Sequence, residues 1–408
     1  MESRTRFMLM VVLIACATKI ASDIYTPSLM IMTQQLPGAS VNTMQLSFPV
    51  FLFGVAMAQL VFGPLSEVIG RKRPLLIGLM IMGVGSVLCA TAPSIQALLI
   101  GRGVQGCGAG ALYALWRAIL RDVFHGEDLA KRSASLFVII MGFGSLAPVI
   151  GGYLVLIDWR SNFWFMLAYV LITSVLVWKG YEESNVHYRQ DKLQWSYIKT
   201  TYAGLLADPI FIGLAGCMFL SFSSVFVWLL VAPVLLMQKC HLSSVWFGWS
   251  VAAVAMIGFA CGALINNRYV SYVGMPTMML IGWSVMLVAG GAMLLGFYML
   301  GVTLWAILPP MVVFYIGSTM VWPNAFAIAF TPYGHIAGYA GSLYGVIQLG
   351  GGALIGGLVT QFPDVDQRPV GALMIVATSG ALWLYRYWIC PAIKLNPGFG
   401  SGFDFQSQ

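Results

Sequence analysis

Lys19-Ile-Ala-Ser-Asp23-Ile-Tyr-Thr-Pro27 lies late in the first long apolar segment of the chain, and the rest of the sequence is interpreted around it. Asp23 is the only carboxylate that we place well inside the hydrocarbon of a membrane. A charged side chain at that depth costs at least about 2.5–3.5 kcal/mol, so it requires a partner, a water-filled cavity or a proton. We therefore expect the remaining segments to hold this acid beside a pathway, with cations near it.

The composition excludes most soluble protein classes. Of 408 residues, 59% are hydrophobic and only 9% are charged, and the mean hydropathy is +0.85. A soluble protein carries about 25% charged residues, so the chain is predicted to be an integral membrane protein. The apolar segments are long, which predicts an all-α structure instead of a barrel of short strands. The first apolar run, residues 7–32, is too long for a signal peptide and is predicted to span the membrane.

Cysteine spacing and charge placement exclude further classes. The seven cysteines contain no C-x-x-C pair and lie mostly in apolar segments, so we expect no disulfide and no metal site. The net charge of +7 is spread over short loops, which argues against a nucleic-acid partner. The sequence contains no Ser-His-Asp set, zinc-protease motif or phosphate-binding loop, so an enzyme is a distant third interpretation and no cofactor is expected beyond a proton gradient.

Gly, Pro and charge clusters divide the chain into twelve predicted membrane spans. They cover approximately 7–32, 44–66, 74–91, 96–119, 133–156, 161–179, 207–233, 244–266, 275–298, 301–325, 338–361 and 369–390. We predict an N-terminal six-helix bundle at 1–179, a cytoplasmic linker at 180–206, a C-terminal six-helix bundle at 207–392 and a cytoplasmic tail at 393–408. Two pseudo-symmetric bundles suggest a duplicated transporter with its site between the halves, near the middle of the membrane.

Lys and Arg placement predicts the orientation. With the N-terminus in the cytoplasm, the outer side carries only Arg160, Lys239 and Arg368, and most other cations outside the spans fall on the inner side. This asymmetry satisfies the positive-inside rule. We expect a multi-pass protein of the bacterial inner membrane, monomeric, with both termini in the cytoplasm.

Three cations lie within the predicted spans, namely Lys19, Arg102 and Arg117, against the single acid Asp23. The second half contains no Asp or Glu between Asp208 and Asp364. A surplus of intramembrane cations points to an anionic or zwitterionic substrate, unless Arg117 extends to the inner surface. Such snorkelling is the interpretation that we favour for Arg117.

The stretch Gly63-Pro-Leu-Ser-Glu67-Val-Ile-Gly70-Arg71-Lys-Arg-Pro-Leu75 resembles the G-x-L-a-D-r-x-G-r-k-x-x-l motif of the major facilitator superfamily. Glu67 stands where that motif has Asp, and the next residue is Val where it has Arg. The resemblance implies a conformational latch at the inner face formed by Gly63, Glu67, Gly70, Arg71 and Asp122. The alternative is an ordinary positively charged loop, which we favour for the two cations after Arg71.

Two further stretches resemble the same superfamily. Arg102-Gly-Val-Gln-Gly-Cys-Gly-Ala109 is similar to its R-x-x-Q-G-x-G-A element. Gly142, followed by Ala147-Pro148-Val-Ile-Gly151-Gly152, resembles the proline-glycine motif of its antiporters. The alternative for these residues is small-residue helix packing around a proline bend, and a buried Arg102 could also bond to backbone carbonyls as a structural element.

Asp23-Ile-Tyr25-Thr-Pro27-Ser-Leu is similar to the D-[MI]-Y-x-P-x-L signature of the bicyclomycin-resistance (Bcr/CflA-like) branch of drug:proton antiporters. Weaker matches extend to about residue 342, in both halves. The resemblance implies the major facilitator fold and a proton-coupled secondary transporter that alternates access. Lys19 departs from this branch, which has an apolar or small residue there.

Helix geometry places Asp23 about 24 Å above the inner end of the first span, and Arg102 about 9 Å below the outer end of the fourth. Across a core of about 30 Å these depths nearly coincide, so the two side chains can meet if the spans are neighbours. We hypothesise that Asp23 binds the coupling proton and that Arg102 holds it ionised. The alternative is a static ion pair of Asp23 with Arg102 or with Lys19.

Aromatic and polar side chains of the spans are candidates for the substrate site, because rings offer stacking and cation–π surfaces. The candidates are Lys19, Tyr25, Tyr113, Trp116, Arg117, Phe226, Trp228, Trp322, Asn324 and Gln348. Multidrug-type efflux of small organic molecules is the leading functional prediction. The alternative is a dedicated carrier, for import or export, of an anionic or zwitterionic metabolite such as a carboxylate siderophore.

Overall fold

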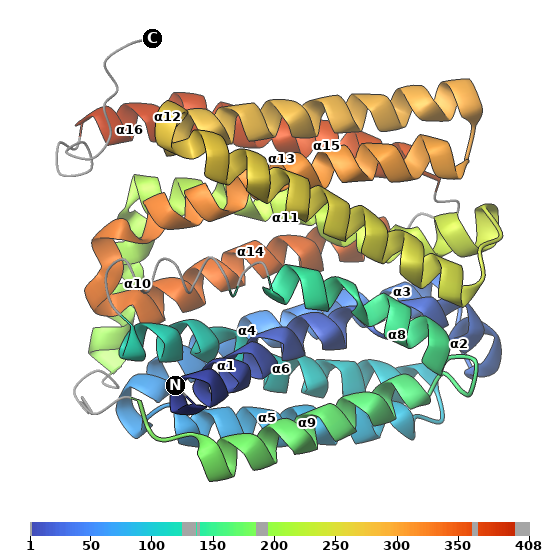
Figure 1. Cartoon of the computed structure of the whole chain (residues 1–408), viewed down its shortest axis with the longest axis horizontal. Helices are drawn as coiled ribbons and strands as arrows, with labels where there is room; N and C mark the ends of the chain where they lie inside the picture. Colours follow the sequence, from blue (N-terminus) through green and yellow to red (C-terminus); the bar gives the residue numbers. More distant parts are fainter. Residues whose placement is uncertain (1, 125–135, 137–138, 185–194, 361–365, 396–408) are drawn as a thin grey trace.

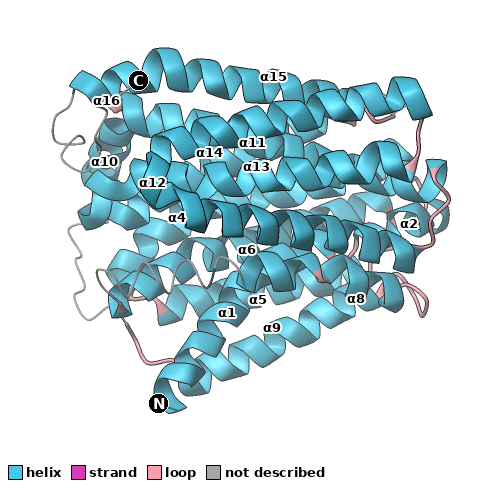
Figure 2. Ribbon diagram, turned by 45° about the horizontal axis from the view of Figure 1, so that its top comes forward, coloured by secondary structure: helices cyan, strands magenta, loops and turns pink. Residues whose placement is uncertain are grey.

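A computed structural model of the chain describes residues 2–124, 136, 139–184, 195–360 and 366–395. Every regular element within these residues is helical, as Figure 2 shows. The prediction of an all-α fold is confirmed. Several helices begin where the sequence supplies a capping side chain: Ser94, Asp208, Ser243 and Thr303 each accept a hydrogen bond from a backbone N–H in the first turn. Such caps satisfy donors that a helix leaves unpaired.

The first half of the chain forms one layer of helices, drawn in blue to green in Figure 1. Its elements are α1 (Glu2–Asp23), η1 (Thr26–Ser28), α2 (Leu29–Gln35), α3 (Val41–Gln45), α4 (Ser47–Ile69), α5 (Lys72–Ala90), α6 (Ile95–Val123), α8 (Ala147–Leu154) and α9 (Ser161–Gly180). The first predicted span is therefore not one continuous helix. It ends at Asp23, passes through a 3₁₀ turn that contains Pro27, and resumes at Leu29.

The second half forms the other layer. Its elements are α11 (Pro209–Pro233), η3 (Val234–Lys239), α12 (Ser244–Leu300), α13 (Leu304–Phe330), η4 (Thr331–Ile336), α14 (Ala337–Val359), α15 (Arg368–Leu384), η5 (Tyr385–Ile389) and α16 (Cys390–Leu395). The predicted linker contains an additional helix, α10 (Trp195–Ala207), which the sequence analysis treated only as a polar connection. The start of α1 and α16 lie at the same end of the molecule, on the left in Figure 1.

Nine helices in the described part of the chain are long and apolar enough to cross a membrane. One of them, α12, covers two predicted spans, which meet at Gly274 with φ of +80°. That backbone conformation favours glycine and turns the chain there. Residues 267–273, predicted as a loop, are therefore helical. The other two predicted spans correspond to α6, which carries four charged residues, and to the shorter apolar helix at 139–154.

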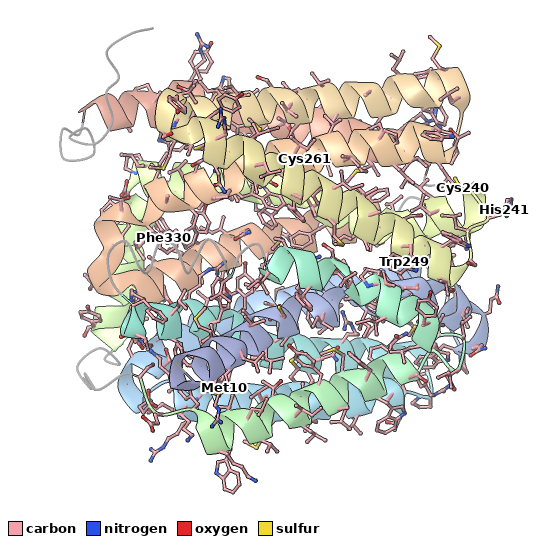
Figure 3. The ribbon with its side chains drawn as sticks, in the orientation of Figure 1. Met10, Cys240, His241, Trp249, Cys261 and Phe330 are labelled. Carbon is pink, nitrogen blue, oxygen red and sulfur yellow. The ribbon has the colours of Figure 1, made fainter. Side chains whose placement is uncertain are left out.

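The two layers contact each other at both ends of the molecule. At the right-hand end of Figure 1, α8 packs against the start of α12, and the Trp249 indole N–H donates to the Tyr153 hydroxyl at 3.4 Å (Figure 3). Along the other side of the interface, α4 packs against α14. The contact between the halves therefore involves α4, α8, α12 and α14, four helices that lie far apart in the sequence.

Candidate functional site

The break between α1 and η1 places Asp23 at the end of a helix in the interior of the protein. Asp23 is 2% exposed. Its carboxylate accepts hydrogen bonds from the Lys19 ammonium, one helical turn earlier on the same face, and from the Ser22 hydroxyl. Lys19 keeps 25% of its side-chain exposure, against 3% for Asp23. The ion pair with Lys19, one of the two alternatives raised from the sequence, is thus present.

Arg102 of α6 lies beside the same break without forming an ion pair with Asp23, both residues being in the described part of the chain. It is fully buried. Its Nη1 donates to the Ala21 carbonyl at 3.0 Å and to Gln105 Oε1 at 2.5 Å, and its Cζ lies 4.2 Å from the ring centroid of Tyr25. The predicted contact between Arg102 and Asp23 is therefore wrong for this conformation, although the two residues do lie on neighbouring helices.

A physical reason accounts for this difference. A helix that ends inside the protein leaves carbonyls in its last turn without intrahelical donors. Arg102 supplies a donor to one of these carbonyls, and a guanidinium is favoured at the negative end of the helix dipole. Lys19 is already within reach of Asp23 through the helical repeat. One donor of Arg102, Nη2, is buried and has no hydrogen-bond partner among the described residues.

Aromatic rings gather in the second half of the chain, beginning with the buried Tyr315 of α13. From Tyr315 a connected series of rings, which we call the aromatic cluster, runs through Phe259, Trp322, Phe222 and Phe226, with centroid separations between 4.1 and 6.1 Å.

The aromatic cluster includes two of the predicted substrate residues, Phe226 and Trp322. Phe226 reaches Phe48 of the first half at 5.8 Å, so the cluster joins the two layers. The Trp322 indole N–H is buried and has no hydrogen-bond partner among the described residues. The cluster therefore offers stacking surfaces and one available donor.

A second group of predicted residues gathers around Arg117 of α6. The Arg117 guanidinium lies over the rings of Tyr113 and Trp116, each at 4.7 Å, and 5.3 Å from the ring of Phe326. Phe326 belongs to α13 and stacks on Phe330 at 4.0 Å, which Figure 3 labels. Arg117 therefore connects the two layers through cation–π contacts.

The last three predicted substrate residues are buried apart from these contacts. Asn324 donates to Asn266 Oδ1 at 2.8 Å and to the carbonyl of Met320 at 2.7 Å, so its amide is used within the second half. Trp228 and Gln348 are buried and join neither the aromatic cluster nor the contacts of Arg117. The structure thus brings together seven of the ten candidates, in three groups: Lys19 and Tyr25 at the helix break, Phe226 and Trp322 in the aromatic cluster, and Arg117 with Tyr113 and Trp116.

The predicted latch residues form a connected network. Arg71 is 1% exposed; its Nε donates to Asp122 at 2.8 Å, Nη2 to Glu67 at 2.9 Å, and Nη1 to the Ser66 hydroxyl at 2.6 Å. The expected pair of Arg71 with Asp122 is present. Burial opposes the charge of Arg71, but the hydrogen bonds and ion pairs with the two acids outweigh it and raise the pKa of Arg71.

The two glycines of the latch motif have separate steric roles. Gly70 ends α4 with φ of +85°, a conformation that side chains rarely adopt, and so turns the chain toward Arg71. A Cβ at Gly63 would lie 1.9 Å from the Ser342 hydroxyl oxygen of α14. One more Cβ, at Gly338, would lie 2.7 Å from Glu67. The motif therefore meets the second half directly.

Glu183 completes this network and was not identified from the sequence. Its carboxylate accepts hydrogen bonds from the backbone N–H groups of Arg71 at 2.7 Å and Lys72 at 3.0 Å. These N–H groups begin α5, so Glu183 acts as a distant helix cap. Ser184 adds a hydrogen bond to Asp122 at 3.1 Å. The only available signal was the position of these residues just after the sixth predicted span.

The proline-glycine motif lies where α8 touches both layers. A Cβ at Gly151 would meet the Ile24 carbonyl oxygen at 1.7 Å, and a Cβ at Gly152 would meet the Ser244 carbonyl oxygen at 2.6 Å. The Pro148 carbonyl approaches Gly248 of α12 in the same way. Gly142 has open space around it. Close packing thus accounts for three of these residues, as the small-residue alternative anticipated.

The described residues contain no group of three or more His, Cys, Asp or Glu side chains placed to hold a metal ion. Tyr315, Phe222 and Phe259, which belong to the aromatic cluster, were also missed by sequence reasoning. No pattern distinguishes these rings from the other aromatics of the spans. Gln105 could have been found, because it belongs to the quoted element that begins at Arg102.

Comparisons with known proteins agree with this geometry. The sequence profile of the Major Facilitator Superfamily matches residues 8–360. Multidrug resistance protein D of Escherichia coli is 27% identical over 97% of this chain and 98% of its own length. The bicyclomycin resistance protein homolog of Haemophilus influenzae is 26% identical over 87% of this chain and 90% of its own.

A solved structure supports the fold. The crystal structure of a D-xylose–proton symporter superposes with a TM-score of 0.74 at 16% identity, covering 94% of this chain and 97% of that one. At this level of identity the likeness concerns the fold alone. It confirms that the arrangement of the helices is that of the major facilitator fold, as the sequence motifs implied.

Proposed function

This chain belongs to the major facilitator superfamily, and we propose that it exports small organic molecules of the multidrug type in exchange for protons. The names of its relatives, which include bicyclomycin and chloramphenicol resistance proteins, support this class of substrate. They do not favour the alternative of a dedicated carrier for an anionic metabolite. The chain is a multi-pass membrane protein, and we propose that it lies in the bacterial inner membrane as a monomer with both termini in the cytoplasm.

The observation that carries the proposal is the buried Asp23 at the helix break. Its environment opposes an isolated negative charge, and the Lys19 ammonium compensates for that charge. A proton delivered to Asp23 would neutralise the carboxylate and leave Lys19 without its partner. The two states of Asp23 therefore differ in charge and in contacts, which is what a coupling site needs.

Asp23 is also positioned to transmit this change to the contact between the halves. The next residue, Ile24, meets Gly151 of α8 through its carbonyl, and α8 packs on α12. The 3₁₀ turn η1, which begins three residues after Asp23, also contacts α11 and α12 of the second half. A change of charge at Asp23 thus acts on both layers, and we propose that it biases their rocking between outward-facing and inward-facing states.

The network around Arg71 supplies a second bias, at the end that we assign to the cytoplasm. Arg71, Asp122 and Glu67 hold the ends of α4, α5 and α6 together. Glu67 and Gly63 in turn touch α14. We propose that this contact favours the state in which the cytoplasmic end is closed, and that it separates when the site opens inward.

The test uses proteoliposomes that contain a pH-sensitive dye and either the wild type or Asp23→Asn. Added chloramphenicol or bicyclomycin should move protons out of the vesicles with the wild type and not with the variant. Asp158→Asn is the matched control, because Asp158 is an exposed acid in a loop. Proton movement that persists in a folded Asp23→Asn protein would refute the role of Asp23.

The same assay tests the drug-efflux proposal. A wild-type protein that moves protons only with citrate-type polycarboxylates would show that the substrate is an anionic metabolite instead. No proton movement with any of these compounds would refute proton-coupled export of this kind.

A further inference from the structure

We propose that Lys19 determines the substrate charge of this transporter, excluding permanent cations and leaving uncharged aromatic compounds as its substrates. The proposal rests on the proposed export function and adds the substrate class to it. Lys19 does so by pairing with Asp23, the one carboxylate at the centre of the interface. A cation that enters the site then meets an ion pair without net charge, in place of a free acid.

The distribution of carboxylates supports this inference. The second half has no Asp or Glu between Asp208 and Asp364, so its helices offer none to a bound cation. In the described first half, Glu67 and Asp122 are engaged by Arg71 at one end of the molecule. Within the described residues, a bound cation therefore has no second acid beside Asp23. Desolvation of a cation without such a partner is strongly unfavourable.

Lys19 is built into the site by its surroundings. A Cβ at Gly144 would lie 2.4 Å from Cγ of Lys19, so the absence of a side chain at Gly144 makes room for the lysine stem. The helical spacing of four residues aims the ammonium at Asp23. Because Lys19 is the more exposed member of the pair, an entering compound meets its positive charge before it reaches Asp23.

The remaining charged groups near the site have the same sign as Lys19. Arg102 is bonded to backbone and amide oxygens close to Asp23, and Arg117 lies in its group of rings without a carboxylate among the described residues. The field around the site is therefore positive or neutral, which opposes binding of a cation.

The aromatic cluster provides what an uncharged aromatic compound requires. Phe222 and Trp322 stack at 4.1 Å within the aromatic cluster, which reaches Phe48 of the first half. Among the described residues, the buried indole N–H of Trp322 has no hydrogen-bond partner. A planar ring that carries a carbonyl or nitro oxygen could extend the stack and accept that hydrogen bond, satisfying a donor that is costly to leave unpaired.

The experiment measures transport of two aromatic probes in proteoliposomes: chloramphenicol, which is uncharged, and tetraphenylphosphonium, which is a permanent cation. We compare the wild type with Lys19→Met, which keeps an apolar stem beside Gly144 and removes the charge. Lys19→Arg is the matched control that keeps the charge. We expect the wild type and Lys19→Arg to move chloramphenicol in strong preference to tetraphenylphosphonium. Lys19→Met should gain tetraphenylphosphonium transport by at least about tenfold, which corresponds to about 1.4 kcal/mol.

The inference and the proposed function fail in different ways. Chloramphenicol transport by the wild type reports on export, and the change in tetraphenylphosphonium transport reports on Lys19. Equal transport of the two probes by the wild type would overturn the inference, and so would a Lys19→Met protein that gains nothing. If Lys19→Met is inactive with both probes, equilibrium binding of tetraphenylphosphonium to the purified protein decides: tighter binding than to the wild type supports the inference, and unchanged binding refutes it.

Discussion

Replacing Arg71 by alanine tests whether the buried network at the end of α4 stabilises this protein. The Arg71 side chain is 1% exposed and donates to Asp122, Glu67 and Ser66. Its removal leaves two carboxylates facing each other in a largely buried position. The matched control is Arg73→Ala, which removes the same charge from an exposed position two residues away.

The expected magnitude follows from the burial of each partner. Breaking a buried ion pair by removing one member costs about 3–5 kcal/mol, because the other member is left without compensation. Asp122 and Glu67 keep 13% and 12% of their side-chain exposure, and Arg121 lies 3.7 Å from Glu67. Water and the second cation, Arg121, therefore partly compensate the two carboxylates left by Arg71→Ala. The expected loss in the free energy of unfolding is then at the low end of this range, about 3 kcal/mol. Arg73→Ala should cost less than about 0.5 kcal/mol, as surface substitutions usually do.

The buried cysteines of the protein provide the assay. Cys16, Cys89 and Cys217 are at most 3% exposed, so a thiol-reactive fluorescent dye labels them only when the helices separate. Heating the detergent-purified proteins with this dye gives an unfolding midpoint for each. We expect the midpoint of Arg71→Ala to fall by several degrees and that of Arg73→Ala to stay near the wild type. Equal midpoints for the two variants would refute the conclusion that the Arg71 network stabilises the protein.

Two further predictions concern contacts made by the same region. Gly63→Ala places a methyl group against Ser342 of α14, so we expect slower transport and a lower unfolding midpoint. Gly357→Ala is the control, because a Cβ there meets nothing within 4 Å among the described residues. An effect of equal size in the control would contradict the close-approach argument. Glu183→Ala removes the carboxylate that accepts hydrogen bonds from the first N–H groups of α5. This should lower the free energy of unfolding by about 0.5–2 kcal/mol, which chemical denaturation of the variant measures. A change below about 0.3 kcal/mol would exclude a capping role.

Some contacts were predictable from the sequence because they are local or belong to a recurring motif. Lys19 and Asp23 are four residues apart in one helix, so their meeting follows from the helical repeat. Arg71 and Asp122 are distant in sequence, and their ion pair was expected only through the resemblance to the superfamily motif. Both pairs are present in the structure.

Other contacts depend on how helices end and pack. Arg102 was expected to pair with Asp23 from their similar depths, yet it bonds to the Ala21 carbonyl. Depth along two helices does not specify where α1 stops, and the break at Asp23 creates the carbonyl acceptors that hold Arg102. Phe226 of α11 likewise meets Phe48 of α4 only because the two halves pack together. Neither arrangement has a signature in residue spacing.

By itself the sequence determined that the chain spans a membrane as helices, in two halves, with one acid in the interior and a recognisable inner-face motif. These properties follow from hydropathy, charge counts and short motifs, all of which are read along the chain. Only the tertiary structure decided which cation neutralises that acid, which rings of the second half meet the first half, and which glycines bring the halves into contact. Those outcomes depend on competition among partners in three dimensions, where the nearest donor and the available space select the contact.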